Sequence, residues 1–199
     1  MKDLHRYPDG GGHALVDKLA VHLGALPENI VLGNGSDEVI GMLSRALLAP
    51  GDQVIMPRPS FLMYEITARS VGAQPVFVPL NDALAIDLNA ILDRVSPRTR
   101  MIFLCNPNNP TGKSYTESML KDLADVARKY HVIVLSDEIY GEVNFAFPHK
   151  SIAKYYPEGT IISSGLSKWC GAGGWTGGRA RAAGAGAGLP RGVRLLLHS

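Results

Sequence analysis

The sequence predicts an α/β fold in which a mostly parallel sheet carries helices on both faces. Short apolar segments alternate with longer segments of helical period, and polar clusters follow several of the apolar segments. This alternation is typical of strand–helix–strand units. With 199 residues, 46% of them hydrophobic, the chain can build the core of one domain, which excludes global disorder.

Apolar periodicity defines the expected helices. In 14–23, for example, Leu15, Leu19, Ala20 and Leu23 share one helical face, and Gly24 is a plausible C-cap. A second helix follows Gly33, with Ser36 or Asp37 as its N-cap. The remaining helices are expected at 60–71, 87–95 and 116–130.

The expected strands are short apolar runs bounded by turn residues. One precedes Gly33, and Pro57 and Pro59 mark a loop after the second. The others are expected at 53–56, 74–78, 100–105, 131–135 and 160–163.

Polar residues cluster directly after four of these strands. The clusters are Gly33–Asp37, Asn106–Gly112, Ser136–Tyr140 and Ser164–Lys168. Ligand sites in open parallel sheets lie beyond the carboxyl ends of the strands. The sequence therefore predicts that these clusters meet in one site.

Charge and composition narrow the class of protein. The net charge of +2 conceals a basic C-terminal segment, 176–199, with four arginines and no acid. Of the 20 Lys and Arg residues, 16 lie before this segment, where they are outnumbered by 18 Asp and Glu. Residues 1–175 are therefore slightly acidic, and a nucleic-acid-binding domain is not expected. No apolar run approaches the ~18 residues that span a bilayer, and the polar N-terminus does not resemble a secretory signal. A cytoplasmic protein without membrane association is expected.

The segment Gly33–Asp37 joins a strand to a helix. Free backbone N–H groups and the helix dipole at such a point favour a bound anion such as phosphate. The alternative is an ordinary capped turn between strand and helix.

The run Val132–Tyr140 ends in two acids, Asp137 and Glu138. A carboxylate there can accept a cationic or N–H group of a ligand, or it can hold Mg²⁺ in a nucleotide hydrolase. The hydrolase hypothesis is disfavoured because the chain has no G-x-x-x-x-G-K-[ST] loop. A solvated acidic pair at a strand end remains the third interpretation.

Lys168 lies in the glycine- and serine-rich stretch SGLSKWCGAGGW. A lysine in a partly desolvated site can lose its proton and attack a carbonyl. The alternative is an exposed loop lysine. Cys170 has no histidine partner and is expected to be a small buried thiol, and the spacing of the six histidines indicates no metal site.

The combined motifs GNGSDE, PRPSF, NPNNPTG, SDEIYGE and SGLSKW resemble fold-type I pyridoxal-phosphate aminotransferases of class I/II. The likeness is strongest to the branch with the histidinol-phosphate and aspartate aminotransferases, and RYPDG near the start fits it. It covers about residues 6–175. It implies the large domain of that fold and a dimer with amino acid and 2-oxo acid substrates.

The resemblance also implies a role for each matching residue. Lys168 resembles the lysine that binds the cofactor aldehyde and then moves the proton between substrate and cofactor. Asp137 resembles the carboxylate that keeps the pyridine nitrogen protonated, so that the ring accepts electrons. Phe61 corresponds to the aromatic residue that stacks on the ring.

Other contacts are implied around the edge of the cofactor. Tyr140 and Asn109 resemble the pair that binds the phenolate oxygen. Tyr7 resembles the tyrosine that reaches the phosphate of the neighbouring subunit. The remaining residues expected near the phosphate are Gly35, Ser36, Asp37 and Ser167.

The sequence departs from the family after Trp175. The family has a phosphate-binding arginine where this chain has Thr176. Glycine, alanine and arginine make up 15 of the 23 residues in 177–199, so a disordered tail is predicted for 176–199. We expect a cofactor-binding large domain at 1–175, a nearly absent N-terminal arm and no small C-terminal domain. The predicted function is amino-group transfer, weakened by truncation; the alternative is a fragment that binds the cofactor or dimerises without catalysis.

Overall fold

A computed structural model describes residues 9–145, 147–171 and 178–182. Their central sheet has seven strands in the order β1-β7-β6-β5-β4-β2-β3. Strand β7 is antiparallel to both of its neighbours, and the pairs from β6 to β3 are parallel. The predicted mostly parallel α/β fold is confirmed.

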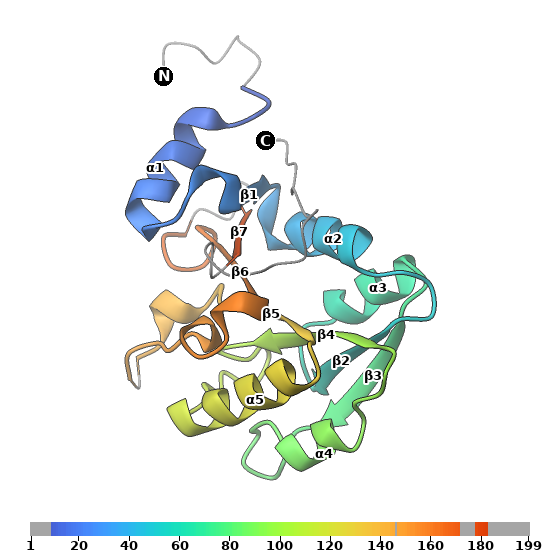
Figure 1. Ribbon diagram of the computed structural model, residues 1–199. Helices are drawn as coiled ribbons and strands as arrows, with labels where there is room; N and C mark the ends of the chain where they lie inside the picture. Colours follow the sequence, from blue (N-terminus) through green and yellow to red (C-terminus); the bar gives the residue numbers. More distant parts are fainter. Residues whose placement is uncertain (1–8, 146, 172–177, 183–199) are drawn as a thin grey trace.

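Helices cover both faces of the sheet (Figure 1). Helices α2 and α3 pack on one face, and α4 and α5 on the other. The helices of the described residues are α1 (His13–Leu23), α2 (Gly35–Leu47), α3 (Met63–Ser70), α4 (Leu88–Leu92) and α5 (Glu117–Lys129). Short 3₁₀ turns are η1 (Pro27–Asn29), η2 (Gly141–Val143), η3 (Ile152–Lys154) and η4 (Pro157–Gly159).

The strands bury alternate side chains on opposite faces. In β4, Met101, Phe103 and Cys105 join the core under α2 and α3, whereas Ile102 and Leu104 join the core under α5. The strands are β1 (Ile30–Gly33), β2 (Gln53–Arg58), β3 (Gln74–Pro79), β4 (Thr99–Cys105), β5 (Ile133–Asp137), β6 (Thr160–Gly165) and β7 (Gly178–Ala182).

Several element boundaries differ from the predictions for a physical reason. Strand β2 continues through Pro57, because its pairing with β4 ends at Ile55 and the missing N–H costs no bond on that side. Strand β5 begins at Ile133, two residues late, because His131 adopts a positive φ of 53° in the turn after α5. Helix α4 is shorter than predicted; the Asp87 side chain accepts the Ala90 N–H at its start.

The prediction that 176–199 lacks regular structure is wrong for 178–182. These residues form β7, which lies between β1 and β6 and pairs with both. A chain segment in that place satisfies its backbone hydrogen bonds on both sides, which overrides the weak strand propensity of glycine and alanine. The rest of 176–199 lies outside the described residues.

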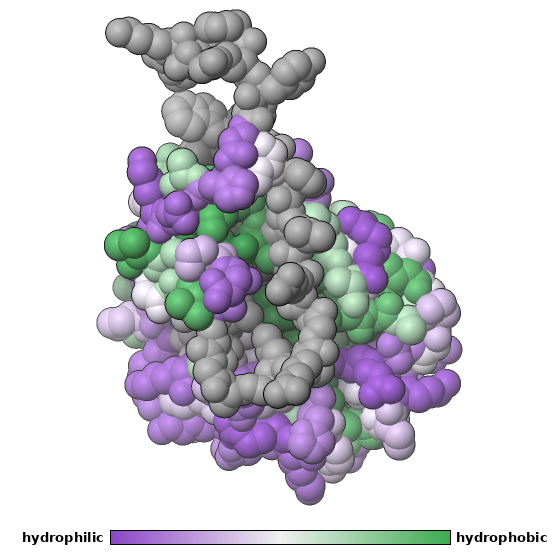
Figure 2. Space-filling view, turned by 45° about the horizontal axis from the view of Figure 1, so that its top comes forward, coloured by the Kyte–Doolittle hydropathy of each residue, from purple (hydrophilic) through white to green (hydrophobic). Residues whose placement is uncertain are grey.

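Hydrophilic residues prevail in the lower half of the face seen in Figure 2, and hydrophobic and hydrophilic residues are mixed above it. Some large apolar side chains are nearly fully exposed: Val21 at 86% and Phe145 at 96%. Among the described residues, none of the helices combines the length and apolar character that crossing a bilayer requires.

Candidate functional site

The polar clusters after the strands meet at one pocket of about 340 Å³. It lies beyond the carboxyl ends of β1, β4, β5 and β6, as expected for a parallel sheet. The residues that line it are Asn34, Gly35, Ser36, Asp37, Phe61, Cys105, Asn109, Asp137, Ile139, Tyr140, Ser167 and Lys168. Nine of the ten predicted site residues are therefore together, and Tyr7 lies outside the described residues.

Asp137 is the last residue of β5 and only 2% exposed. Its Oδ2 accepts the hydroxyl of Tyr64 at 2.7 Å, and its Oδ1 accepts the N–H of Ile139 at 3.3 Å. Burial raises the pKa of the Asp137 carboxyl from 3.8 to about 6, although both hydrogen bonds oppose the rise. A cationic ligand group beside this carboxylate would stabilise its charge.

Lys168 reaches the same pocket from the loop after β6. Its Nζ lies 5.9 Å from the centre of the Tyr140 ring. Lys168 is exposed, so of the two interpretations that the sequence left open, the partly desolvated lysine is wrong and the exposed loop lysine is confirmed. The pocket therefore joins an accessible amine to a buried carboxylate, the two groups that the predicted chemistry requires.

The start of α2 forms another wall. Gly35 has a φ of +77°. Among the described residues, apart from its chain neighbours and the backbone of its own helix, no atom lies within 4 Å of where a Cβ would be, so the backbone there can be approached by a ligand. Ser36 and Asp37 lie in the first turn, where backbone N–H groups lack helical partners. The predicted cap at Ser36 or Asp37 is wrong: Asn34 is the N-cap, and the Glu38 carboxylate accepts its N–H at 2.5 Å. This wall suits an anion.

Tyr64 is a residue that the sequence analysis missed. It is fully buried, and its ring stacks on Phe103 with centroids 4.7 Å apart and meets Phe61 edge-on at 5.5 Å. It follows Phe61 by three residues, a spacing close to one helical turn, which is the signal that could have revealed it. Phe61, the predicted stacking residue, is thereby fixed against the core.

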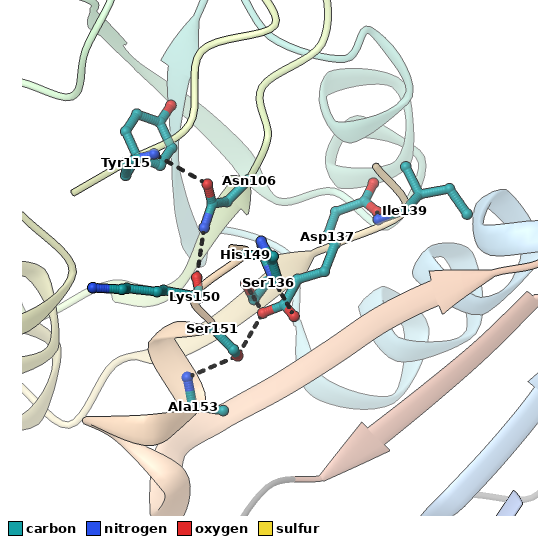
Figure 3. Close-up of polar contacts among 10 residues, drawn as sticks. Asn106, Tyr115, Ser136, Asp137, Ile139, His149, Lys150, Ser151 and Ala153 are labelled. Atoms are coloured by element: carbon teal, nitrogen blue, oxygen red, sulfur yellow. Dashed lines mark hydrogen bonds and ion pairs between the residues drawn. The ribbon is translucent and has the colours of Figure 1, made fainter. Parts of the chain in front are cut away.

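Glu138 does not line this pocket but belongs to a second network, whose partners Ser136, His149 and Ser151 are labelled in Figure 3. Its Oε1 accepts the hydroxyls of Ser136 at 2.9 Å and Ser151 at 2.6 Å, and its Oε2 lies 2.9 Å from Nε2 of His149. The side chain of Glu138 is only 10% exposed. The interpretation of Asp137 and Glu138 as a solvated acidic pair is therefore wrong.

The loop that carries Asn109 is tied to the same region. Asn106 donates from Nδ2 to the carbonyl of Lys150 at 3.0 Å and accepts the N–H of Tyr115 at 3.2 Å (Figure 3). Together with Glu138, it joins the ends of β4 and β5 to the segment 149–151. This support holds the pocket residues Asn109 and Tyr140 on ordered backbone.

The two cysteines differ from expectation. Cys170 is exposed, so its prediction as a buried thiol is wrong. Cys105 is the buried one, lines the pocket, and donates its S–H to the carbonyl of Pro107 at 3.3 Å. Burial raises the pKa of the Cys105 thiol to about 12, so it stays protonated and is a poor nucleophile.

The sequence of this chain matches a known protein family. The family model for aminotransferase class I and II matches residues 1–183. Histidinol-phosphate aminotransferase 2 of Carboxydothermus hydrogenoformans is 40% identical over 153 residues, 77% of this chain and 40% of that protein. An aromatic amino acid aminotransferase of Rhodococcus jostii is 44% identical over 140 residues, 70% of this chain and 39% of that protein.

Solved structures of aminotransferases have the same fold as this chain. An aminotransferase from Escherichia coli superposes with a TM-score of 0.86 at 30% identity, covering 91% of this chain and 48% of that one. A double mutant of the aspartate aminotransferase of Thermus thermophilus superposes with a TM-score of 0.80 at 30% identity, covering 86% of this chain and 46% of that one. The chain thus spans about 40% of the length of the curated relatives above. It belongs to the aminotransferase class I and II family, whose members depend on pyridoxal phosphate.

Proposed function

We propose that this chain binds pyridoxal 5′-phosphate and takes part in transferring an amino group between an amino acid and a 2-oxo acid. The observation that carries the proposal is that Lys168 and Asp137 line one pocket together with Phe61. The family membership supports it.

The pocket residues fit the cofactor. A buried carboxylate, Asp137, suits a protonated ring nitrogen, since each charge offsets the desolvation of the other. The open backbone at Gly35 and the first turn of α2 suit a phosphate. An aromatic side chain, Phe61, and an accessible amine, Lys168, complete the set.

When bound, the cofactor supplies an aldehyde and an electron-accepting ring. In the proposed site, Lys168 would hold the cofactor through its aldehyde, and its amine would take the proton from the substrate Cα and return it to the cofactor carbon that receives the amino group. The Asp137 carboxylate would stabilise the protonated ring nitrogen. Asn109 and Tyr140 would hydrogen-bond the phenolic oxygen, and Phe61 would orient the ring by stacking.

The assembly and location are part of the proposal. Members of this family are generally dimeric, and we propose a homodimer in which Tyr7 contacts the phosphate bound by the neighbouring subunit. The exposed Leu62 and Ile66 next to the pocket residue Phe61 support a covered surface there. A cytoplasmic location remains a prediction from the sequence. The molar mass measured by light scattering during size-exclusion chromatography would test the homodimer.

The test of transfer is a half-reaction. Cofactor-loaded protein is mixed with an amino acid in the absence of a 2-oxo acid, and the bound cofactor is extracted and separated by chromatography. Amino-group transfer leaves pyridoxamine phosphate and a stoichiometric 2-oxo acid. Unchanged pyridoxal phosphate across a panel of amino acids would instead favour the fragment that binds without catalysis.

A further inference from the structure

Tyr64 has no role in the site as predicted, yet its hydroxyl donates a hydrogen bond to Asp137. Its hydroxyl lies 2.7 Å from Oδ2 of Asp137, and neither residue is more than 2% exposed. The two residues are 73 positions apart. Tyr64 belongs to α3 and to the core under α2, and Asp137 is the last residue of β5.

We propose that Tyr64 is a positioning residue for the cofactor ring, which acts by keeping the Asp137 carboxylate ionised and fixed in direction. The proposal rests on the proposed function, since it assigns Asp137 to the ring nitrogen. It adds a residue that acts through Asp137 and lies outside the lining of the pocket.

The geometry leaves the Tyr64 hydroxyl little freedom. Its ring lies parallel to that of Phe103, with an interplanar angle of 2°, and meets Phe61 at 85°. A ring packed in this way cannot swing, so the direction of the hydroxyl bond is set by the core. Burial also raises the pKa of Tyr64 well above its usual range, so the phenol remains a donor throughout the working pH range.

The two oxygens of the Asp137 carboxylate have different partners. Oδ2 accepts the hydroxyl of Tyr64. Within the part of the chain that the structure describes, the hydrogen bond to Oδ1 is the long one from the Ile139 N–H at 3.3 Å, so Oδ1 can accept a further bond from a group in the pocket that Asp137 lines. The other titratable groups around Asp137 are Asp37 of α2, Cys105 of β4, Glu138 after β5, and Tyr140 and Lys168 in the pocket. Asp37 and Glu138 oppose ionisation of Asp137, so the phenol counters two like charges.

Tyr64→Phe removes the hydroxyl and keeps the ring, and Tyr156→Phe is the matched control in the opposite core. The Asp137 carboxyl is titrated in the cofactor-free protein by ¹³C NMR of labelled aspartate, assigned with Asp137→Asn. The Tyr64→Phe midpoint is expected about one pH unit higher than wild type, because a hydrogen bond to a charged group is lost. Tyr156→Phe should titrate as wild type does.

The second measurement is the affinity for pyridoxal phosphate as a function of pH. Wild-type affinity should fall as the pH drops through the Asp137 midpoint, and the fall should come about one unit higher in Tyr64→Phe, a tenfold loss between the two midpoints. An unmoved Asp137 titration, or a moved titration with an unmoved affinity profile, overturns the inference. If wild type binds no cofactor at any pH, the proposed function and this role both fail, while the NMR titration still reports the hydrogen bond separately.

A further arm covers failure of Tyr64→Phe to fold. Biosynthetic 3-fluorotyrosine keeps every ring in place and makes the phenol a stronger donor. The Asp137 midpoint should then move down, opposite to the shift in Tyr64→Phe. A midpoint that stays in place or moves up contradicts the role of Tyr64.

Discussion

At the scale of single residues, the site depends on a charge buried in the core. Asp137 is held almost out of water, and its hydrogen bonds offset only part of the desolvation. Such a carboxylate destabilises the folded protein until a cation or proton joins it. The protein thus carries a cost in stability at the position where the proposed ligand needs a negative charge.

This cost predicts a pH dependence. The folded Asp137 pKa is about 6 against 3.8 unfolded, so the folded protein holds more protons between these values and its stability falls as the pH rises through them. The free energy of unfolding falls by a total on the order of 3 kcal/mol, and the fall is complete above about pH 6. Urea unfolding of wild type and Asp137→Asn from pH 4 to 7 measures it, since effects of other groups cancel in the difference. A difference in free energy of unfolding that stays constant with pH would contradict it.

At the scale of elements, the network around Glu138 fixes the end of β5. One carboxylate receives hydrogen bonds from Ser136 on the strand and Ser151 on the following segment, and it pairs with His149. His149 in turn packs on the backbone at Gly141, where an added Cβ would lie 3.1 Å from the imidazole. The turn η2, directly after Tyr140, is held in this way.

Glu138→Gln is expected to lower the free energy of unfolding by about 1–3 kcal/mol, because a buried charged acceptor is lost. The exposed Glu142→Gln is the control in the adjacent turn and should change it by less than about 0.5 kcal/mol. Chemical denaturation at neutral pH compares the two. Equal effects of the two substitutions would show that the network does not stabilise the fold.

The helices and strands also show which parts of the fold and site could be predicted from the sequence. The alternation of strands and helices predicted the fold. That topology also brings together Asp137, at the end of β5, and Lys168, in the loop after β6. Tyr64 could not be found in this way, because its contact with Asp137 depends on how α3 packs on the sheet. Residues 178–182 were missed because local propensity says nothing of the two strands that flank β7.

At the scale of the whole molecule, β7 joins β1 to the rest of the sheet. Strand β1 has β7 as its neighbour, and β1 leads directly to the first turn of α2 in the pocket. The pocket wall at Gly35 is therefore attached to the sheet in two ways, through the pairing of β1 with β7 and through the packing of α2 on the sheet face.

A proline in β7 tests this attachment. Ala180 pairs with Val31 of β1 and Ser163 of β6, and Ala180→Pro removes an N–H from a central strand. We expect the free energy of unfolding to fall by about 3 kcal/mol or more, and the β1 amides to exchange their hydrogens faster. Ala180→Ser keeps the N–H and is the control. Unchanged exchange in the proline variant would contradict the observed strand order.

The most direct test of the central claim is the site of covalent attachment. Protein incubated with pyridoxal phosphate is reduced with borohydride, digested, and mapped by mass spectrometry. The phosphopyridoxyl group is expected on Lys168, absent from Lys168→Ala, retained in the exposed Lys150→Ala, and strongly reduced in Asp137→Ala, in which the acid that holds the ring nitrogen is lost. A label spread over other lysines, or one on Lys168 that is indifferent to Asp137, would contradict the claim that these two residues form one cofactor site.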